Sequence, residues 1–283
     1  MKRSYAGLFV LLIAMALPAT ALAASSTAVA GSMLVHGQIV VATDGSVQSY
    51  TLDHRDRLPG YVTKLLDSNI SAWRFEPVQR DGTPVVAKAR MSIRLVAQRK
   101  NDGNYAVRII GQWFGSHKAD ASPSQSVRYK DRRKPQYPLK ALKQHVAGTV
   151  YVVARINRQG NVDKAAVEQV NLRTQGTPAR MRRWRLLLAD SALSAARNST
   201  YEIPTTGPEM HKSHWTVRYT VDYTLGDEDH AYGQWVAFIP GPQHEIGWLD
   251  ADDRMAGSAN AMPSGALQMA SVNRLQLLGQ PGS

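Results

Sequence analysis

The chain of 283 residues contains no cysteine, which excludes a disulfide scaffold, thiol catalysis and any zinc site built on thiolates. Acidic residues are also few, because 22 Asp and Glu stand against 34 Lys and Arg and give a formal net charge of +12. Such a basic surface suits anionic envelope surfaces or acidic segments of a partner. Long apolar runs are missing after the N-terminal segment, so no later stretch is expected to cross a bilayer.

The N-terminal segment has the pattern of an export signal. Its basic start, Met1-Lys2-Arg3, precedes an uncharged run over residues 4–26 that contains the small-residue sequence Ala21-Leu22-Ala23. This pattern predicts a signal peptide over residues 1–23, cleaved after Ala23, and therefore a periplasmic protein with no nucleic-acid partner. The alternative is an uncleaved anchor in the inner membrane with the rest of the chain in the periplasm, because residues 5–24 are long enough to span a bilayer.

A pattern of two strands, one helix and one further strand occurs twice. In the first copy, residues 33–41 alternate in polarity and lead through a turn at Gly45 into a second strand. Residues 62–73 carry apolar side chains at helical spacing, and residues 85–96 alternate as one long strand. A further strand is possible over residues 105–114.

The second copy repeats this order after Gly148. Gly160-Asn161-Val162 matches Gly45-Ser46-Val47, and residues 190–197 match residues 67–74. The separation between the two matches is longer in the second copy, so about eight extra residues are expected before its helix, within residues 175–185. We predict an α+β protein with two small β-β-α-β domains, each an antiparallel sheet with helices packed on one face.

The start of the second copy has a distinctive local sequence. In Lys134-Pro135-Gln136-Tyr137-Pro138 the two prolines hold the chain extended before a short helix, which we expect Gly148 to end. A Gly-x-Val strand start and the Gly-Asn-Val turn follow. Together these features resemble the C-terminal domain of TonB-type energy transducers. The first copy has only that family's helix ending, Trp73-Arg74-Phe75-Glu76-Pro77, which the second copy lacks.

The resemblance implies a TonB C-terminal domain over residues 128–226 and a degenerate copy of it over residues 33–97. Residues 98–127 would be a linker with one possible strand. Residues 227–283 would be a partly flexible extension, to which the resemblance gives no role.

The resemblance also implies that the last strand of the domain captures an extended peptide of a TonB-dependent outer-membrane receptor. In such β-augmentation the peptide pairs with the unpaired backbone groups of an edge strand. The implied partner-binding residues are Gln136, Tyr137, Trp215, Val217, Tyr219 and Val221. The side chains of Trp215 and Tyr219 are more simply explained as parts of the core, but backbone pairing does not depend on them.

In the family, peptide capture supports energy-coupled transport, and the second partner would be an inner-membrane proton-channel motor if the N-terminus stays attached. Residues 24–33 reach only about 30 Å when extended, so a cleaved protein would not act as a transducer in the usual way. The alternative function is a periplasmic scaffold or self-associating module that forms a homodimer. No catalytic motif, cofactor or metal site is recognisable, and an enzyme is not expected.

Basic residues gather in two places in the second copy. One group lies over residues 128–134, and the other consists of Arg180, Arg182, Arg183 and Arg185. These side chains either form a solvated surface, steer acidic segments or approach anionic lipid.

Overall fold

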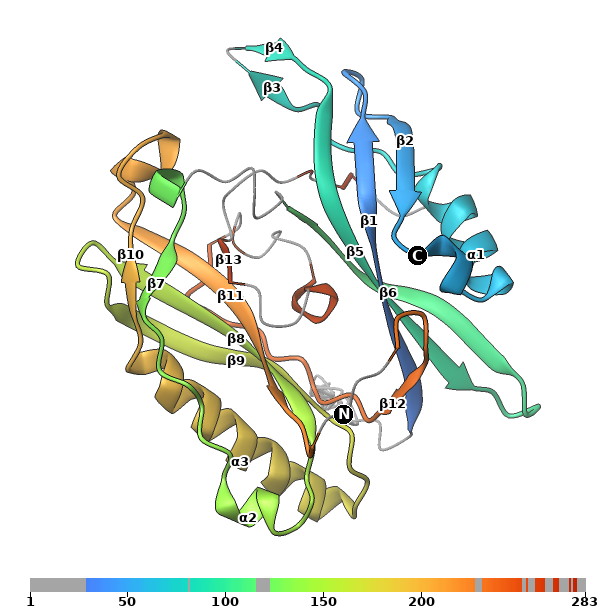
Figure 1. Cartoon of the computed structure of the whole chain (residues 1–283), viewed down its shortest axis with the longest axis vertical. Coiled ribbons are helices and arrows are strands. Elements are labelled where there is room, and N and C mark those ends of the chain that lie inside the picture. The colour runs from blue at the N-terminus through green and yellow to red at the C-terminus, as the bar shows by residue number, and fades with distance from the viewer. Residues whose placement is uncertain are drawn as a thin grey trace, which may run out of the picture.

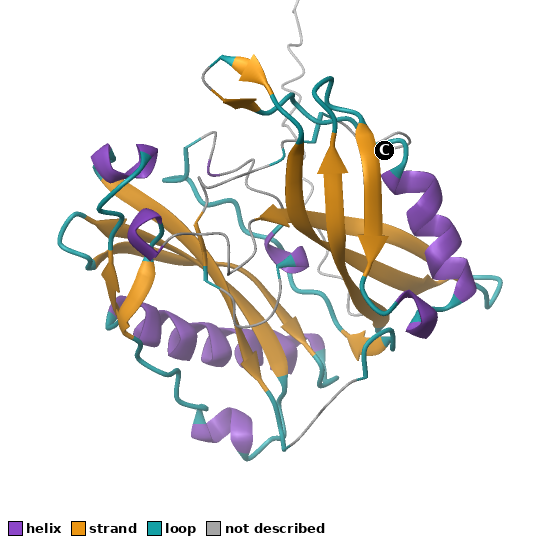
Figure 2. Ribbon diagram, turned by 45° about the horizontal axis from the view of Figure 1, so that its top comes forward, coloured by secondary structure: helices purple, strands orange, loops and turns teal. Residues whose placement is uncertain are grey.

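A computed structural model describes residues 29–80, 82–115, 123–226, 231–250, 253, 258–262, 267–269, 275 and 277–278. Its two main sheets lie side by side, with one long helix on the outer side of each and C-terminal segments between them (Figure 1). A view from another direction shows the same arrangement (Figure 2). The predicted α+β class with antiparallel sheets is confirmed.

The first sheet is built from the first half of the chain. Its strands pair in the order β2, β1, β5 and β6. Its elements are β1 (Ala30–Val41), β2 (Val47–Leu52), η1 (Arg55–Arg57), α1 (Gly60–Ile70), β5 (Ala87–Arg99) and β6 (Tyr105–Gly115), with the small hairpin of β3 (Gln79–Arg80) and β4 (Thr83–Pro84) before β5. The strand expected over residues 105–114 forms as β6 and belongs to this sheet.

The second sheet repeats the order of a hairpin, a helix and a strand. Its strands pair in the order β9, β8 and β11, and α3 packs against β8 and β9. Its elements are η2 (Pro123–Gln125), β7 (Arg128–Asp131), α2 (Leu139–Leu142), β8 (Gly148–Asn157), β9 (Val162–Leu172), α3 (Pro178–Arg197), β10 (Thr200–Glu202), η3 (Pro208–His211) and β11 (His214–Tyr223). β7 and β10 pair with each other as a separate two-stranded sheet.

Each helix buries one stripe of side chains, as the helical spacing predicts. In α1 the buried residues are Val62, Leu66 and Ile70. In α3 they include Met181, Trp184 and Leu188, which pack against the second sheet. The two cores are therefore separate clusters, one under each helix.

The hairpin turn of each sheet makes the same kind of contact with the chain that follows the helix. Gly45 and Gly160 both have φ near +80°, and a Cβ on either would lie about 2 Å from the carbonyl oxygen of Phe75 or Tyr201. The backbone N–H of Phe75 donates to the Gly45 oxygen, and that of Tyr201 to the Gly160 oxygen, each at 2.8 Å. Glycine is needed at both turns because the chain that follows the helix passes directly over them.

Two local expectations are wrong. The short helix after the Tyr-Pro sequence ends at Leu142, well before Gly148, because the chain turns through His145 at φ +51° and Gly148 already begins β8. The extra residues of the second copy do not form a separate insertion before the helix. They are divided between β9, which has 11 residues where β2 has 6, and the start of α3, which begins five residues before the position that matches the start of α1.

The described parts of residues 231–278, here called the C-terminal strap, contact the two sheets in alternation. β12 (Val236–Phe238) pairs with β1, and the next residue, Ile239, bridges to Leu172 of β9. Further on, η4 (Ala259–Ala261) lies against β6, β13 (Gln268–Met269) pairs with β11, and Leu277 bridges to Phe75. The extension therefore joins the two sheets through its described residues, a role that the sequence did not indicate.

Candidate functional site

The outer edge of β11 is one of the two sides of the second sheet, and β9 forms the other. On its inner side β11 pairs with β8 along its whole length, from His214 opposite Asn157 to Tyr223 opposite Gly148. On its outer side β13 pairs with only two residues, Val217 and Arg218. Within the described chain, β13 is the only strand that pairs with this outer edge. An edge strand of this kind presents unpaired N–H and C=O groups to an incoming strand.

The short strand β13 corrects the expectation of a wholly free edge. Met269 lies opposite Val217 and Gln268 lies opposite Arg218. The sulfur of Met269 also accepts a hydrogen bond from the backbone N–H of Val127, at 2.9 Å. Part of the edge that the family resemblance assigns to a partner is thus occupied by the protein's own C-terminal strap.

The four expected partner-binding side chains on β11 lie in the core. Trp215 and Val217 pack in the cluster under β10, and Tyr219 and Val221 pack in the cluster under α3. The indole nitrogen of Trp215 donates to the carbonyl oxygen of Glu209 at 3.0 Å, and burial raises the pKa of Tyr219, so its hydroxyl stays neutral. These residues can meet a partner through their backbone, whereas their side chains stabilise the sheet.

The two expected residues of the Tyr-Pro sequence have different positions. The Tyr137 hydroxyl donates to the Val146 carbonyl, and its ring meets the ring of Tyr223 edge-on at 5.3 Å. Tyr137 therefore lies at the end of β11, as a packing residue. Gln136 is exposed and lines a groove of about 860 Å³ between the Tyr-Pro sequence and α3, and its carbonyl accepts a hydrogen bond from Ser191.

The other face of β11 holds a buried ion pair that the sequence analysis missed. The Arg218 guanidinium meets the carboxylate of Glu168 with nitrogen–oxygen distances of 2.9 to 3.0 Å. It also donates to the Asp253 carbonyl at 2.7 Å, and the Thr216 hydroxyl donates to the Asp253 carboxylate at 2.5 Å. This network fastens the strap to the second sheet. Its only sequence signal is an arginine between two threonines, Thr216 and Thr220, on that face of the strand.

The second group of basic residues does not form one surface. Arg185 is buried, donates to the carbonyl oxygens of Val170 and Pro240, and has its pKa lowered by burial. Its assignment to a solvated or steering cluster is therefore wrong. Arg180, Arg182 and Arg183 are exposed.

Comparison with known proteins gives no relative: no family model, no curated protein and no solved structure matches the chain. Among the helices of the described residues, none combines the length and apolar character needed to cross a membrane.

Proposed function

We propose that the protein binds an extended peptide of a partner by adding it as a strand to the outer edge of β11. The observation that carries the proposal is the pairing of this edge: along the ten residues of β11, β13 pairs with it only at Val217 and Arg218. A strand of about five residues would cover the part of β11 after Arg218, a span of roughly 17 Å. Backbone hydrogen bonds would supply most of the affinity.

The partner class in this proposal comes from the resemblance of residues 134–162 to the TonB C-terminal domain. The partner would be an extended segment of a TonB-dependent outer-membrane receptor, and the protein would act in the periplasm in support of energy-coupled transport. The basic surface supports this choice, because a net charge of +12 would attract an acidic segment and speed its encounter with the edge.

Two adjacent proline substitutions, Val221→Pro and Asp222→Pro, test the edge. In an antiparallel strand, successive N–H groups point alternately to the two sides, so one of these residues donates to β8 and the other faces outward. The inward-facing substitution lowers the melting temperature, because it removes a ladder hydrogen bond. The outward-facing one leaves the melting temperature nearly unchanged and weakens peptide binding.

Fluorescence anisotropy with labelled peptides from receptor N-termini measures this binding. Thr149→Ala serves as the matched control, because Thr149 lies opposite Asp222 on β8 and away from the outer edge. Binding that survives in the variant of unchanged stability contradicts the proposal. So does the absence of peptide binding together with a dimer that dissociates on dilution, which favours the self-associating module.

A further inference from the structure

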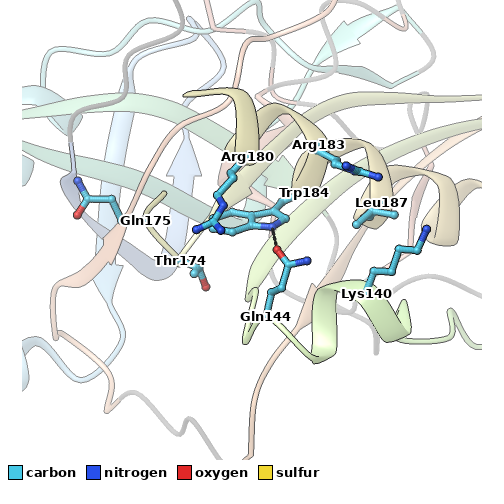
Figure 3. Close-up of a pocket in the computed structure, with 8 residues that line it drawn as sticks. All are labelled: Lys140, Gln144, Thr174, Gln175, Arg180, Arg183, Trp184 and Leu187. Atoms are coloured by element: carbon cyan, nitrogen blue, oxygen red, sulfur yellow. Dashed lines mark hydrogen bonds between the residues drawn. The ribbon is translucent and has the colours of Figure 1, made fainter. Parts of the chain in front are cut away.

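A pocket of about 620 Å³ lies between α2, the loop after β9 and the first turns of α3 (Figure 3). It is separate from the outer edge of β11. Its lining residues are Lys140, Gln144, Thr174, Gln175, Arg180, Arg183, Trp184 and Leu187.

The floor of the pocket is held in place by hydrogen bonds. The indole nitrogen of Trp184 donates to the side-chain oxygen of Gln144 at 2.7 Å (Figure 3). The Thr174 hydroxyl donates to the His145 carbonyl at 2.8 Å and accepts from the Ala147 N–H at 2.9 Å. Such a floor keeps its shape with or without a ligand, which lowers the entropic cost of binding.

The charged side chains of the pocket all have the same sign. Arg180 and Arg183 belong to α3, and Lys140 extends from α2 toward Leu187, across Trp184 from Arg180 (Figure 3). No carboxylate lines the pocket, and within the described chain none of the three cations forms an ion pair. Elsewhere on the surface, arginines such as Arg128 and Arg155 do pair with carboxylates. Three unpaired cations around one cavity favour an anion of more than one charge.

Part of the pocket has no counterpart in the first copy. When Asp190 is aligned with Asp67, the start of α1 lies opposite Arg183. The first residues of α3, including Arg180, therefore have no counterpart in α1. Arg180, one of the three cations of the pocket, thus belongs to the added part of α3.

We propose that this pocket binds the phosphate of a phosphomonoester, with the carbon part of the ester against Leu187 and the edge of Trp184. A phosphomonoester carries about 1.5 to 2 negative charges at neutral pH and offers three acceptor oxygens, which suits two guanidinium groups and one ammonium. A carboxylate would neutralise only one of the three cations. The ester comes either from a soluble molecule or from the headgroup of a membrane lipid, and Leu139, 71% exposed beside Lys140 on α2, lies next to the position that a lipid would take.

Isothermal titration of the full-length protein with phenyl phosphate tests the soluble source. Flotation with phosphatidylcholine vesicles, with and without phosphatidic acid, tests the lipid source. The pocket variant is Arg180→Gln/Arg183→Gln, and the matched control is Arg182→Gln, an exposed arginine of the same helix that does not line the pocket. We expect about tenfold weaker binding or more in the pocket variant and little change in the control.

Binding of phenyl phosphate that depends on the pocket arginines supports the soluble source, and binding only of vesicles with phosphatidic acid supports the headgroup. Failure to bind either probe overturns the proposal, as does an equal loss in the control variant. All three substituted arginines are exposed, so thermal melting should confirm that each variant is folded. Peptide binding at β11 should not change in any of them, which separates this test from that of the proposed function.

Discussion

The strands β5 and β11 occupy the same place in the two β-β-α-β units, yet their outer edges are covered very differently. β6 pairs with β5 from Arg90 to Arg99, whereas β13 pairs with β11 only at Val217 and Arg218. The first edge is closed by the strand that follows it in the chain, and the second is partly closed by a distant segment. One unit therefore has no room for a further strand at this edge, and the other does.

The two strands are more alike on the faces that contact the strap. Arg94 of β5 and Arg218 of β11 each donate a hydrogen bond to a carbonyl oxygen of the strap, at Asn260 and Asp253 respectively. They differ in charge pairing, because only Arg218 has a carboxylate partner, Glu168, within the described chain. Both strands thus fasten the strap, but in the second the arginine is also held by a buried ion pair with Glu168 of β9.

The largest difference between the units should appear when these arginines are replaced. We expect Arg218→Met to lower the free energy of unfolding by about 3–5 kcal/mol, because it leaves the buried Glu168 without a partner. Arg94→Met should cost about 1 kcal/mol, the value of a typical hydrogen bond. Urea unfolding followed by tryptophan fluorescence measures both. Equal losses would show that the ion pair adds nothing to the fastening, and Glu168→Leu in the Arg218→Met protein should restore most of the stability.

The shared turn predicts equal effects in the two units. Gly45→Ala and Gly160→Ala each force a side chain into the left-handed region and against a carbonyl oxygen about 2 Å away. We expect each to cost about 1–3 kcal/mol or more in the same unfolding experiment. Gly82→Ala is the control, because its φ is also positive but no atom lies within 4 Å of the added Cβ. If Gly45→Ala or Gly160→Ala costs no more stability than Gly82→Ala, that turn can move away from the chain that passes over it.

Local signals in the sequence were sufficient to predict the repeated order of elements. Alternating strands, helical spacing and the turn glycines all lie within one unit, so each could be recognised without knowing the rest of the fold. The strap could not be predicted in this way. β13 has only two residues, Gln268 and Met269, and so carries no periodic pattern, and its partner lies some fifty residues earlier in the chain.

The site was predictable only in part for the same reason. The sequence indicated β11 as a binding strand but not the strap that covers part of it. The sequence places Arg185 among basic neighbours, but successive residues of a helix are rotated by about 100° from each other. Arg185 and Arg183 therefore lie on different faces of α3, and Arg185 lies on the buried one. The pocket lined by Lys140 and Arg180 was not predictable, because α2 and α3 line one cavity only once they pack against each other.

A smaller effect is expected when the edge of β11 is opened further. Gln268→Pro should disrupt β13, because proline holds φ at about −65°, away from the extended values of a strand, and has no backbone N–H. A peptide could then pair with Val217 and Arg218 as well, and one or two added hydrogen bonds should tighten binding by about two- to tenfold. Anisotropy titrations measure this, with Asn260→Ala, a strap change at the first sheet, as control. Unchanged or weaker binding would mean that β13 does not compete for the edge.

The smallest effect should be a dependence of stability on pH that arises in the first unit, where β6 covers the edge of β5. His36 of β1 shares a hydrogen bond of 2.8 Å between its Nδ1 and the Ser92 hydroxyl, and its ring stacks on that of Tyr232 in the strap at 6.1 Å. The Tyr232 hydroxyl also accepts from the backbone N–H of His36 at 2.9 Å. A charge on His36 would therefore form at a contact between the first sheet and the strap.

Burial lowers the pKa of His36; the charges of Arg90 and Arg94 act in the same direction, and Asp53 opposes them. The unfolded chain binds this proton below about pH 6.5, whereas the folded chain binds it only at lower pH, so stability falls as the pH falls through that range. Asp53 does not contribute there, because its hydrogen bond from Arg90 lowers its pKa. The melting temperature should therefore drop between about pH 7.5 and 5.5, and less so in His36→Asn, which keeps a partner for Ser92. The control is His54→Asn, because the ring of His54 also contacts Tyr232. If this control reduces the pH-dependent drop in melting temperature as much as His36→Asn does, the pH dependence does not come from His36.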